Sequence, residues 1–191
     1  MQAERPNFAN RIQLDLELLF SDLPIMTEWL AGEYYSALLV CLEHHNHKSG
    51  IEALLQNLDE TLARLELVWS KPLDEYDRRS WGGPGNAAET AGEGIAWLIV
   101  YLFTDYAVIE RSARGSGVDF WLGDKGDVDK LIFQTKARME AKARTHIQYD
   151  SGIREVLKKA LEQTEKSDHT DLPAYIVVTE FSRPVIYLVQ K

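Results

Sequence analysis

The chain is poor in the features that mark secreted and membrane proteins. Its 191 residues include one cysteine, Cys41, which excludes an internal disulfide framework and fits a reducing compartment. The N-terminal residues lack a basic segment followed by an apolar run, so we expect no secretory signal. The longest apolar run, residues 95–103, is about half of the roughly 20 residues that a membrane-spanning helix needs. These absences predict a cytoplasmic protein with no membrane partner.

Positive charge is also scarce. The net charge of −9 argues against indiscriminate binding of nucleic acid through a broad basic surface. The charge is uneven, however: residues 1–80 contain 7 basic and 14 acidic side chains, whereas residues 125–159 contain 9 basic and 5 acidic ones. The second window is therefore net basic, although a solvated helix face would produce the same excess. An apolar content of 45% indicates a globular protein.

A glycine-rich interruption at residues 81–86, WGGPGN, divides the chain. We expect an acidic N-terminal region of helix and hairpin at 1–85 and a second unit at 86–191. Thr27 is a suitable helix cap, and the leucines near residue 65 alternate with polar residues as in a strand. The elements expected in the first region are a helix at 27–47 and a hairpin of strands at 51–55 and 62–69.

The second unit shows a regular order of helix and strand patterns. It begins with a helix that is apolar on nearly every face and must be covered on several sides. A later helix has an amphipathic stripe with the i, i+3, i+4 spacing of apolar residues. The predicted order is α-β-β-β-α-β plus one strand, with helices at 88–103 and 151–165 and strands at 106–113, 117–123, 130–139, 174–179 and 185–189. The fold class is therefore mixed α/β.

Two of these predicted strands carry residues suited to phosphodiester chemistry. Asp119 follows a glycine-rich turn, and Gln134 and Lys136 follow the apolar run Leu-Ile-Phe. Side chains alternate between the faces of a strand, so Gln134 and Lys136 point the same way and Thr135 the opposite way. A carboxylate can hold a hard cation through oxygen, and an adjacent lysine can orient the attacking water.

This arrangement resembles the core of the PD-(D/E)XK nuclease superfamily, closest to its Mrr-like branch, in which Q-x-K replaces E-x-K. The resemblance covers the second half of the chain and implies a restriction-endonuclease-like αβββαβ core. It implies that Glu93, Asp119 and an oxygen of Gln134 or of the Thr135 backbone hold Mg²⁺ or Mn²⁺, while Lys136 positions the water. It also suggests a role in bacterial or phage defence.

Two details of this site stay open in the sequence. An amide at position 134 removes a negative charge, which should weaken cation binding. A literal E-x-K occurs at Glu140 and Lys142, but it lacks the apolar run of the other site, so we rank it second. Glu89 lies one helical turn before Glu93 on the same face, and its place near the helix N-terminus is sufficient to explain it.

Other charged residues are candidates for weaker roles. Arg138, Arg154 and Lys158 could contact the nucleic-acid backbone, although ordinary solvated surface is the stronger explanation for Arg154 and Lys158. The cluster HHNH at residues 44–47 imitates an HNH nuclease motif, but adjacent histidines at a helix C-terminus need no metal.

The resulting hypothesis is a metal-dependent endonuclease that cleaves DNA in preference to RNA. A second hypothesis is a catalytically inactive subunit of the same fold, which docks a protein partner through its acidic N-terminal region or binds nucleic acid. A third, a regulator that mimics nucleic acid with its acidic half, has no motif behind it. The sequence leaves the target, a homo-oligomeric state and the need for a companion ATPase open.

Overall fold

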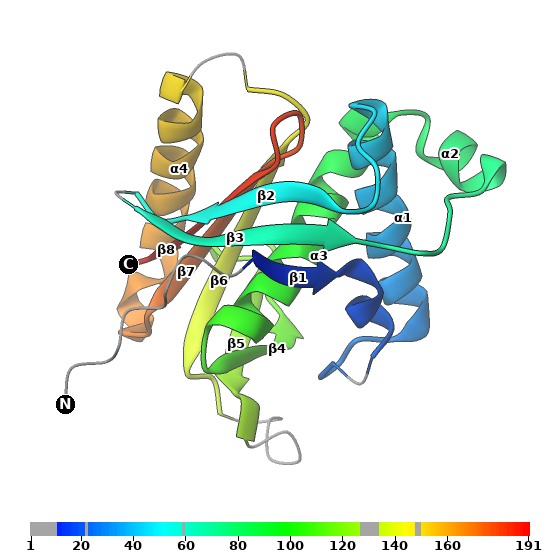
Figure 1. Ribbon diagram of the computed structural model, residues 1–191. Coiled ribbons are helices and arrows are strands. Elements are labelled where there is room, and N and C mark those ends of the chain that lie inside the picture. The colour runs from blue at the N-terminus through cyan, green and yellow to red at the C-terminus, as the bar shows by residue number, and fades with distance from the viewer. Residues whose placement is uncertain (1–10, 22, 59, 127–133, 148–149) are drawn as a thin grey trace.

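The protein has a mixed α/β fold built on one eight-stranded sheet, as the computed structural model shows (Figure 1). The structure describes residues 11–21, 23–58, 60–126, 134–147 and 150–191. The strand order is β1-β3-β2-β8-β7-β6-β5-β4, with parallel pairing in β1/β3, β2/β8 and β6/β7 and antiparallel pairing elsewhere.

The elements of the N-terminal part are a strand, a short 3₁₀ helix, two helices and a hairpin. Their bounds are β1 Arg11–Asp15, η1 Leu16–Phe20, α1 Glu28–His44, β2 Ile51–Gln56, β3 Thr61–Val68 and α2 Glu75–Trp81. The predicted helix and hairpin are confirmed, with the Thr27 hydroxyl accepting a hydrogen bond from the Leu30 N–H at 3.2 Å. The sheet continues past the interruption at 81–86, because β2 pairs with β8.

The second part has the predicted order of helices and strands. The bounds are α3 Pro84–Phe103, β4 Tyr106–Arg111, β5 Phe120–Asp124, β6 Ala137–Arg144, α4 Asp150–Thr164, η3 Glu165–Thr170, β7 Ala174–Glu180 and β8 Val185–Gln190. Among the described helices, none is long and apolar enough to cross a membrane.

Helices α1 and α3 cover one face of the sheet and pack against each other (Figure 1). Their contact is close at Gly94, where a Cβ would lie 2.9 Å from the Tyr34 Cβ. Helix α4 covers the other face of the sheet. Its Ile153, Leu157 and Ala160 belong to the same buried cluster as alternate residues of β7. Strand β7 is buried along its whole length because helices cover both of its faces.

The prediction for the third strand of this unit is confirmed only in part. We expected it at 130–139, but β6 begins at Ala137 and ends at Arg144, and residues 134–136 are not in a strand. The apolar run before Gln134 lies outside the described residues. The side chains of Ala137, Met139, Ala141 and Ala143 face α3 with a period of two, and three of the four are alanines. Small side chains are needed because α3 lies close: a Cβ on Gly92 would be 2.6 Å from the Ala143 Cβ.

Candidate functional site

A hydrogen-bonded turn delivers Asp119 to the start of β5. Gly117 has a φ of +88°, and a Cβ there would lie 2.5 Å from the Gln163 carbonyl oxygen, so glycine is required. The Ser116 hydroxyl accepts from the Val118 N–H at 3.3 Å and donates to the Val118 carbonyl at 2.9 Å. The turn that we read as a lead-in to Asp119 is therefore fixed on both sides, by its own hydrogen bonds and by α4.

Strand β6 continues past the first residue of β5, and Asp119 lies just before that residue, beside the unpaired part of β6. The first paired residue of β5 is Phe120, opposite Met139, and the Asp119 N–H donates to the Met139 carbonyl at 2.9 Å. The Asp119 Oδ2 then accepts from the Ala141 N–H at 2.9 Å, so a carboxylate takes the place of the missing strand partner. This pairing brings Asp119 beside Glu140 and Lys142, the E-x-K that the sequence analysis ranked second.

Glu140 is fully buried, and its charge is poorly compensated. Its Oε1 forms an ion pair with the Lys142 ammonium, while Oε2 has no hydrogen-bond partner among the described residues as long as both carboxyl groups are ionised. When Glu140 is protonated, it shares a hydrogen bond with Asp119. Burial, followed by the charge of Asp119, raises the pKa of Glu140 to about 7, against the opposing effect of Lys142. The site thus has two adjacent carboxyl groups that share too little positive charge.

The pKa values of Asp119 and Lys142, beside Glu140, are both raised. Burial raises the pKa of Asp119, against the Ala141 N–H and the charge of Lys142, which lower it. Burial alone would lower the pKa of Lys142, but its hydrogen bond to Glu140 and the charges of Glu140, Asp119 and Glu89 raise it. The ammonium therefore stays charged between acidic groups, and carboxyl groups of this kind accept either a proton or a cation.

Glu93 lies nearby on α3, but it is engaged by other residues. Its carboxylate accepts two hydrogen bonds from Arg111 at 3.0 and 2.6 Å and one from the Tyr34 hydroxyl at 2.9 Å. Arg111 also donates to the Tyr34 oxygen at 2.8 Å. The charge of Glu93 acts on Asp119, as a minor contribution to its raised pKa.

The other predicted site residues lie elsewhere. Gln134, Thr135 and Lys136 precede β6, with Gln134 and Lys136 exposed. The Lys136 N–H donates to the Leu122 carbonyl, toward the far end of β5. Lys136 is five positions before Ala141, a distance of about 16 Å along an extended chain. The structure therefore does not bring Gln134 and Lys136 to Asp119, and the residues before them, 127–133, lie outside the described part.

The predicted nucleic-acid contact of Arg138 is also wrong, because its side chain is 4% exposed and hydrogen-bonded inside the protein. Arg154 is exposed on α4, and Lys158 is exposed there with Glu162 at 3.7 Å. Glu89 is exposed at the start of α3, within range to act on Lys142. Each of these three stays accessible to a ligand.

The histidines at the C-terminal end of α1 contact one another and the residue that follows β7. The ring centroids of His44 and His45 are 4.8 Å apart, and the His47 Nε2 lies 2.9 Å from the Phe181 carbonyl. Burial lowers the pKa of His45. Within the described residues, no group of three or more His, Cys, Asp or Glu side chains is arranged to hold a metal ion.

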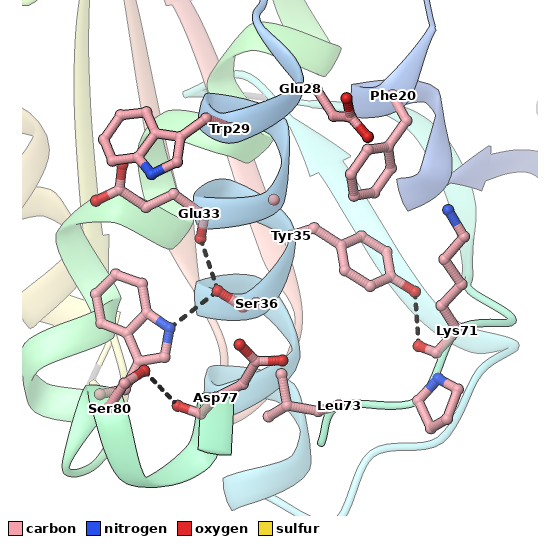
Figure 2. Close-up of a pocket in the computed structure, with 13 residues that line it drawn as sticks. Phe20, Glu28, Trp29, Glu33, Tyr35, Ser36, Lys71, Leu73, Asp77 and Ser80 are labelled. Atoms are coloured by element: carbon pink, nitrogen blue, oxygen red, sulfur yellow. Dashed lines mark hydrogen bonds between the residues drawn. The ribbon is translucent and has the colours of Figure 1, made fainter. Parts of the chain in front are cut away.

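A separate groove of about 650 Å³ lies between α1, α2 and the segment after β3 (Figure 2). Aromatic rings of Phe20, Trp29 and Trp81 and carboxylates of Glu28, Glu33 and Asp77 line it. The Trp81 Nε1 donates to the Ser36 hydroxyl at 3.0 Å, and the Tyr35 hydroxyl donates to the Lys71 carbonyl at 2.8 Å, so hydrogen bonds fix its floor. In the sequence, this groove is reflected only in the excess of acidic residues over residues 1–80, which does not indicate where the groove lies.

Comparison of the chain with protein-family models, with curated proteins and with solved structures found no match. The function must therefore be argued from the arrangement of the side chains themselves.

Proposed function

We propose that this protein is a metal-dependent nuclease that cleaves phosphodiester bonds, with DNA as the preferred substrate. The site is Asp119, Glu140 and Lys142, in place of the Q-x-K at Gln134 and Lys136. With this change of register the resemblance to PD-(D/E)XK nucleases becomes a match to the commoner E-x-K pattern. It also removes the difficulty that an amide at position 134 raised for cation binding.

The observation that supports the proposal is that β6 continues past the start of β5, next to Asp119. This arrangement brings Asp119 beside the buried Glu140 and Lys142, through the 2.9 Å bond from the Ala141 N–H to Asp119 Oδ2. A purely structural role would favour a neutralised cluster. Glu140 instead keeps an unpartnered buried oxygen and a pKa raised to about 7, which costs stability at neutral pH.

The residues present fit a divalent cation. Mg²⁺ commonly binds through one or two carboxylates and keeps several waters, so Asp119 and Glu140 suffice without a third acidic ligand. The unpartnered Glu140 Oε2 supplies a free oxygen, and the Ala141 carbonyl shares the open edge with its N–H, because both groups of a strand residue point to one side. When bound, Mg²⁺ or Mn²⁺ would polarise the phosphate and lower the pKa of a bound water.

The chain's own residues would orient the reaction. Lys142 carries its charge between the two carboxylates and the exposed Glu89, where it can donate hydrogen bonds to an attacking water or to a phosphate oxygen. Asp119 is fixed by backbone hydrogen bonds on both of its sides, so its carboxylate needs little reordering on binding. The burial of Glu140 keeps bulk water away from the cation that its carboxylate would hold.

The test is cleavage of plasmid, linear DNA and RNA by the purified protein with Mg²⁺ or Mn²⁺. We expect Asp119→Asn and Lys142→Ala to lower the rate by roughly a hundredfold or more, as loss of one electrostatic contact at a reacting centre typically does. Gln134→Ala and Lys136→Ala are matched controls that should cleave at the wild-type rate. Wild-type rates in Asp119→Asn and Lys142→Ala, or a loss in Lys136→Ala instead, would sink the proposal.

A second candidate function is that of a partner-binding subunit, favoured by the groove beside α1 (Figure 2). Among the described residues, no basic side chain pairs with Glu28, Glu33 or Asp77. Gly32 lies in the groove with nothing within 4 Å of a Cβ, so its backbone is open to a ligand. Carboxylates beside aromatic rings suit an arginine- or lysine-bearing segment of a partner protein.

This candidate is tested by titrating a synthetic arginine-rich peptide and following the fluorescence of the groove tryptophans. We expect saturable binding that weakens with salt and is lost in a Glu28→Gln, Glu33→Gln, Asp77→Asn triple variant. An equally long glutamate-rich peptide is the control. Absence of saturable binding to the arginine-rich peptide would remove this candidate without touching the nuclease.

A further inference from the structure

Arg111 is a fixed arginine whose guanidinium is only partly used. Three of its five N–H donors bond Glu93 and Tyr34, so two stay available in the described part of the structure. Its side chain is 53% exposed, whereas that of Glu93 is 12% exposed. The arginine therefore has one edge bound to a buried carboxylate and the other turned outward.

A second surface fixes the plane of the guanidinium. Its carbon lies 4.7 Å from the centroid of the Phe120 ring, and Phe120 is itself buried at the start of β5. The Tyr34 hydroxyl is also buried and bonds both Arg111 and Glu93. A carboxylate, a hydroxyl and an aromatic face together hold the group in one orientation, more than a surface ion pair requires.

The position of Arg111 places this group next to the candidate site. In the β4/β5 ladder it lies opposite Phe120, the residue that follows Asp119. The next residue of the chain, Ser112, donates its N–H to the Asp119 carbonyl at 2.8 Å. Asp119 and Phe120 alternate between the two faces of β5, so Arg111 lies on the α3 side of the sheet at this strand end. The charge of Asp119 nevertheless acts on Arg111, so the guanidinium is within electrostatic range of the carboxylate.

We infer that Arg111 binds a phosphate of the nucleic acid beside the bond that is cut, and that Glu93 and Tyr34 are positioning residues for it. The donors that remain are the Nε–H and one Nη1 N–H, which lie on different sides of the group, so each can give a single hydrogen bond to a phosphate oxygen. The Glu93 and Tyr34 contacts fix the orientation of these donors, and a lysine ammonium would not be held in the same way. The inference rests on the proposed nuclease function and deepens it. It replaces the expected role of Glu93 as a metal ligand, because both Glu93 oxygens already accept hydrogen bonds from Arg111.

The charges explain what kind of binding this is. Arg111 and Glu93 form a pair with no net charge, so the pair attracts nucleic acid weakly at long range. Its contribution comes at contact, through directed hydrogen bonds to one phosphate. A protein with a net charge of −9 can therefore bind nucleic acid at one point without a broad basic surface.

The experiment measures binding and cleavage separately. Binding of a fluorescent 20-base-pair DNA duplex is measured by anisotropy with Ca²⁺, and cleavage with Mg²⁺ as the Mg²⁺ concentration is varied. We expect Arg111→Ala and Arg111→Lys each to raise the DNA Kd by about tenfold. Arg114→Ala, which changes an exposed arginine of the neighbouring turn, is the matched control and should bind as wild type.

Glu93→Gln separates a positioning role from metal binding. As a positioning residue its loss weakens DNA binding and leaves the half-saturating Mg²⁺ concentration unchanged, and Tyr34→Phe does the same to a smaller degree. A several-fold rise in that concentration with unchanged DNA binding would make Glu93 a metal ligand and overturn the inference. Arg111→Lys keeps a cation beside Glu93, so the test does not depend on whether Arg111→Ala folds.

The outcomes also separate this inference from the proposed function. If the wild type binds DNA without cleaving it and the Arg111 variants lose binding, the phosphate contact stands and the nuclease falls. If the wild type cleaves and the Arg111 variants bind and cleave normally, the inference alone falls. If the wild type neither binds nor cleaves DNA or RNA, both fall.

Discussion

Arg138 and Glu140 lie two residues apart on β6, both are buried, and both carry a formal charge, yet their surroundings differ. Every nitrogen of the Arg138 guanidinium donates to an acceptor. The partners are the carbonyls of Leu172 and Thr164 at 3.0 and 2.9 Å, the Ser167 hydroxyl at 2.6 Å and the Asp168 carboxylate at 2.6 Å. Glu140 has one ion pair with Lys142 and one oxygen without a hydrogen-bond partner.

The difference shows two uses of a buried charge. Arg138 joins η3 and the segment before β7 to the sheet, and its role is complete within the chain. Glu140 is left with a shortage of positive charge that a bound cation would correct. A charged residue inside a protein therefore indicates a ligand only when its own chain leaves it unsatisfied.

The largest expected effect is on stability at Arg138. Arg138→Met removes the donors to two carbonyls and a buried hydroxyl, and we expect it to lower the free energy of unfolding by roughly 3–4 kcal/mol in urea titrations. Glu140→Gln, measured alongside at pH 8, should leave stability at or above that of the wild type. Equal losses in both variants would show that the two charges have the same structural role.

The pH dependence of stability sharpens the same contrast. The folded-state pKa of Glu140, about 7, lies above its value of 4.5 in the unfolded chain, so the folded protein binds the proton more tightly. Its stabilising contribution is present below pH 4.5 and is lost as the pH rises through 7, on the order of 3 kcal/mol in total. We expect urea titrations in a metal chelator to show this decrease between pH 5 and pH 8.

His45 requires a matched comparison in this experiment. Its pKa is lowered, so its contribution is lost as the pH falls and has the opposite sign over the same range. The quantity to compare is therefore the difference between wild type and Glu140→Gln at each pH. A difference that does not change from pH 5 to pH 8 would contradict the assignment of the shift to Glu140. Mn²⁺ should stabilise the wild type at pH 8 more than at pH 5.5.

Much of the fold could be predicted because its signals are local. The Thr27 cap, the amphipathic stripe of α4 and the apolar pattern of β7 each fix an element within its own segment. The short β1 and α2 were not predicted. Strand β1 has one buried residue in five, and α2 has none, so neither shows the apolar periodicity of a core element.

Only part of the cluster around Asp119 could be predicted, for a related reason. Asp119 was found because an aspartate at a glycine turn before an apolar strand is unusual, whereas Lys136 was chosen because an apolar run precedes it. The true neighbour, Glu140, lies in a strand whose inner face is mostly alanine, and alanine gives a weak strand signal. The requirement for small residues comes from Gly92 on α3, a tertiary contact that no local pattern reveals.

The smallest expected effect is the loss of stability when one acceptor of the Arg138 guanidinium is removed. Ser167→Ala removes one buried acceptor, whose hydroxyl lies 2.6 Å from Arg138 Nη1 and also donates to the Thr164 carbonyl at 3.1 Å. Because Arg138 Nη1 keeps its bond to that carbonyl, we expect a loss of about 1–2 kcal/mol, measured by urea unfolding. Neither the pH dependence of stability nor the stabilisation by Mn²⁺ should change, because both arise at residues outside the Arg138 network. A shift in either would mean that the two buried charges are coupled along β6, and the contrast between them would then be one of degree.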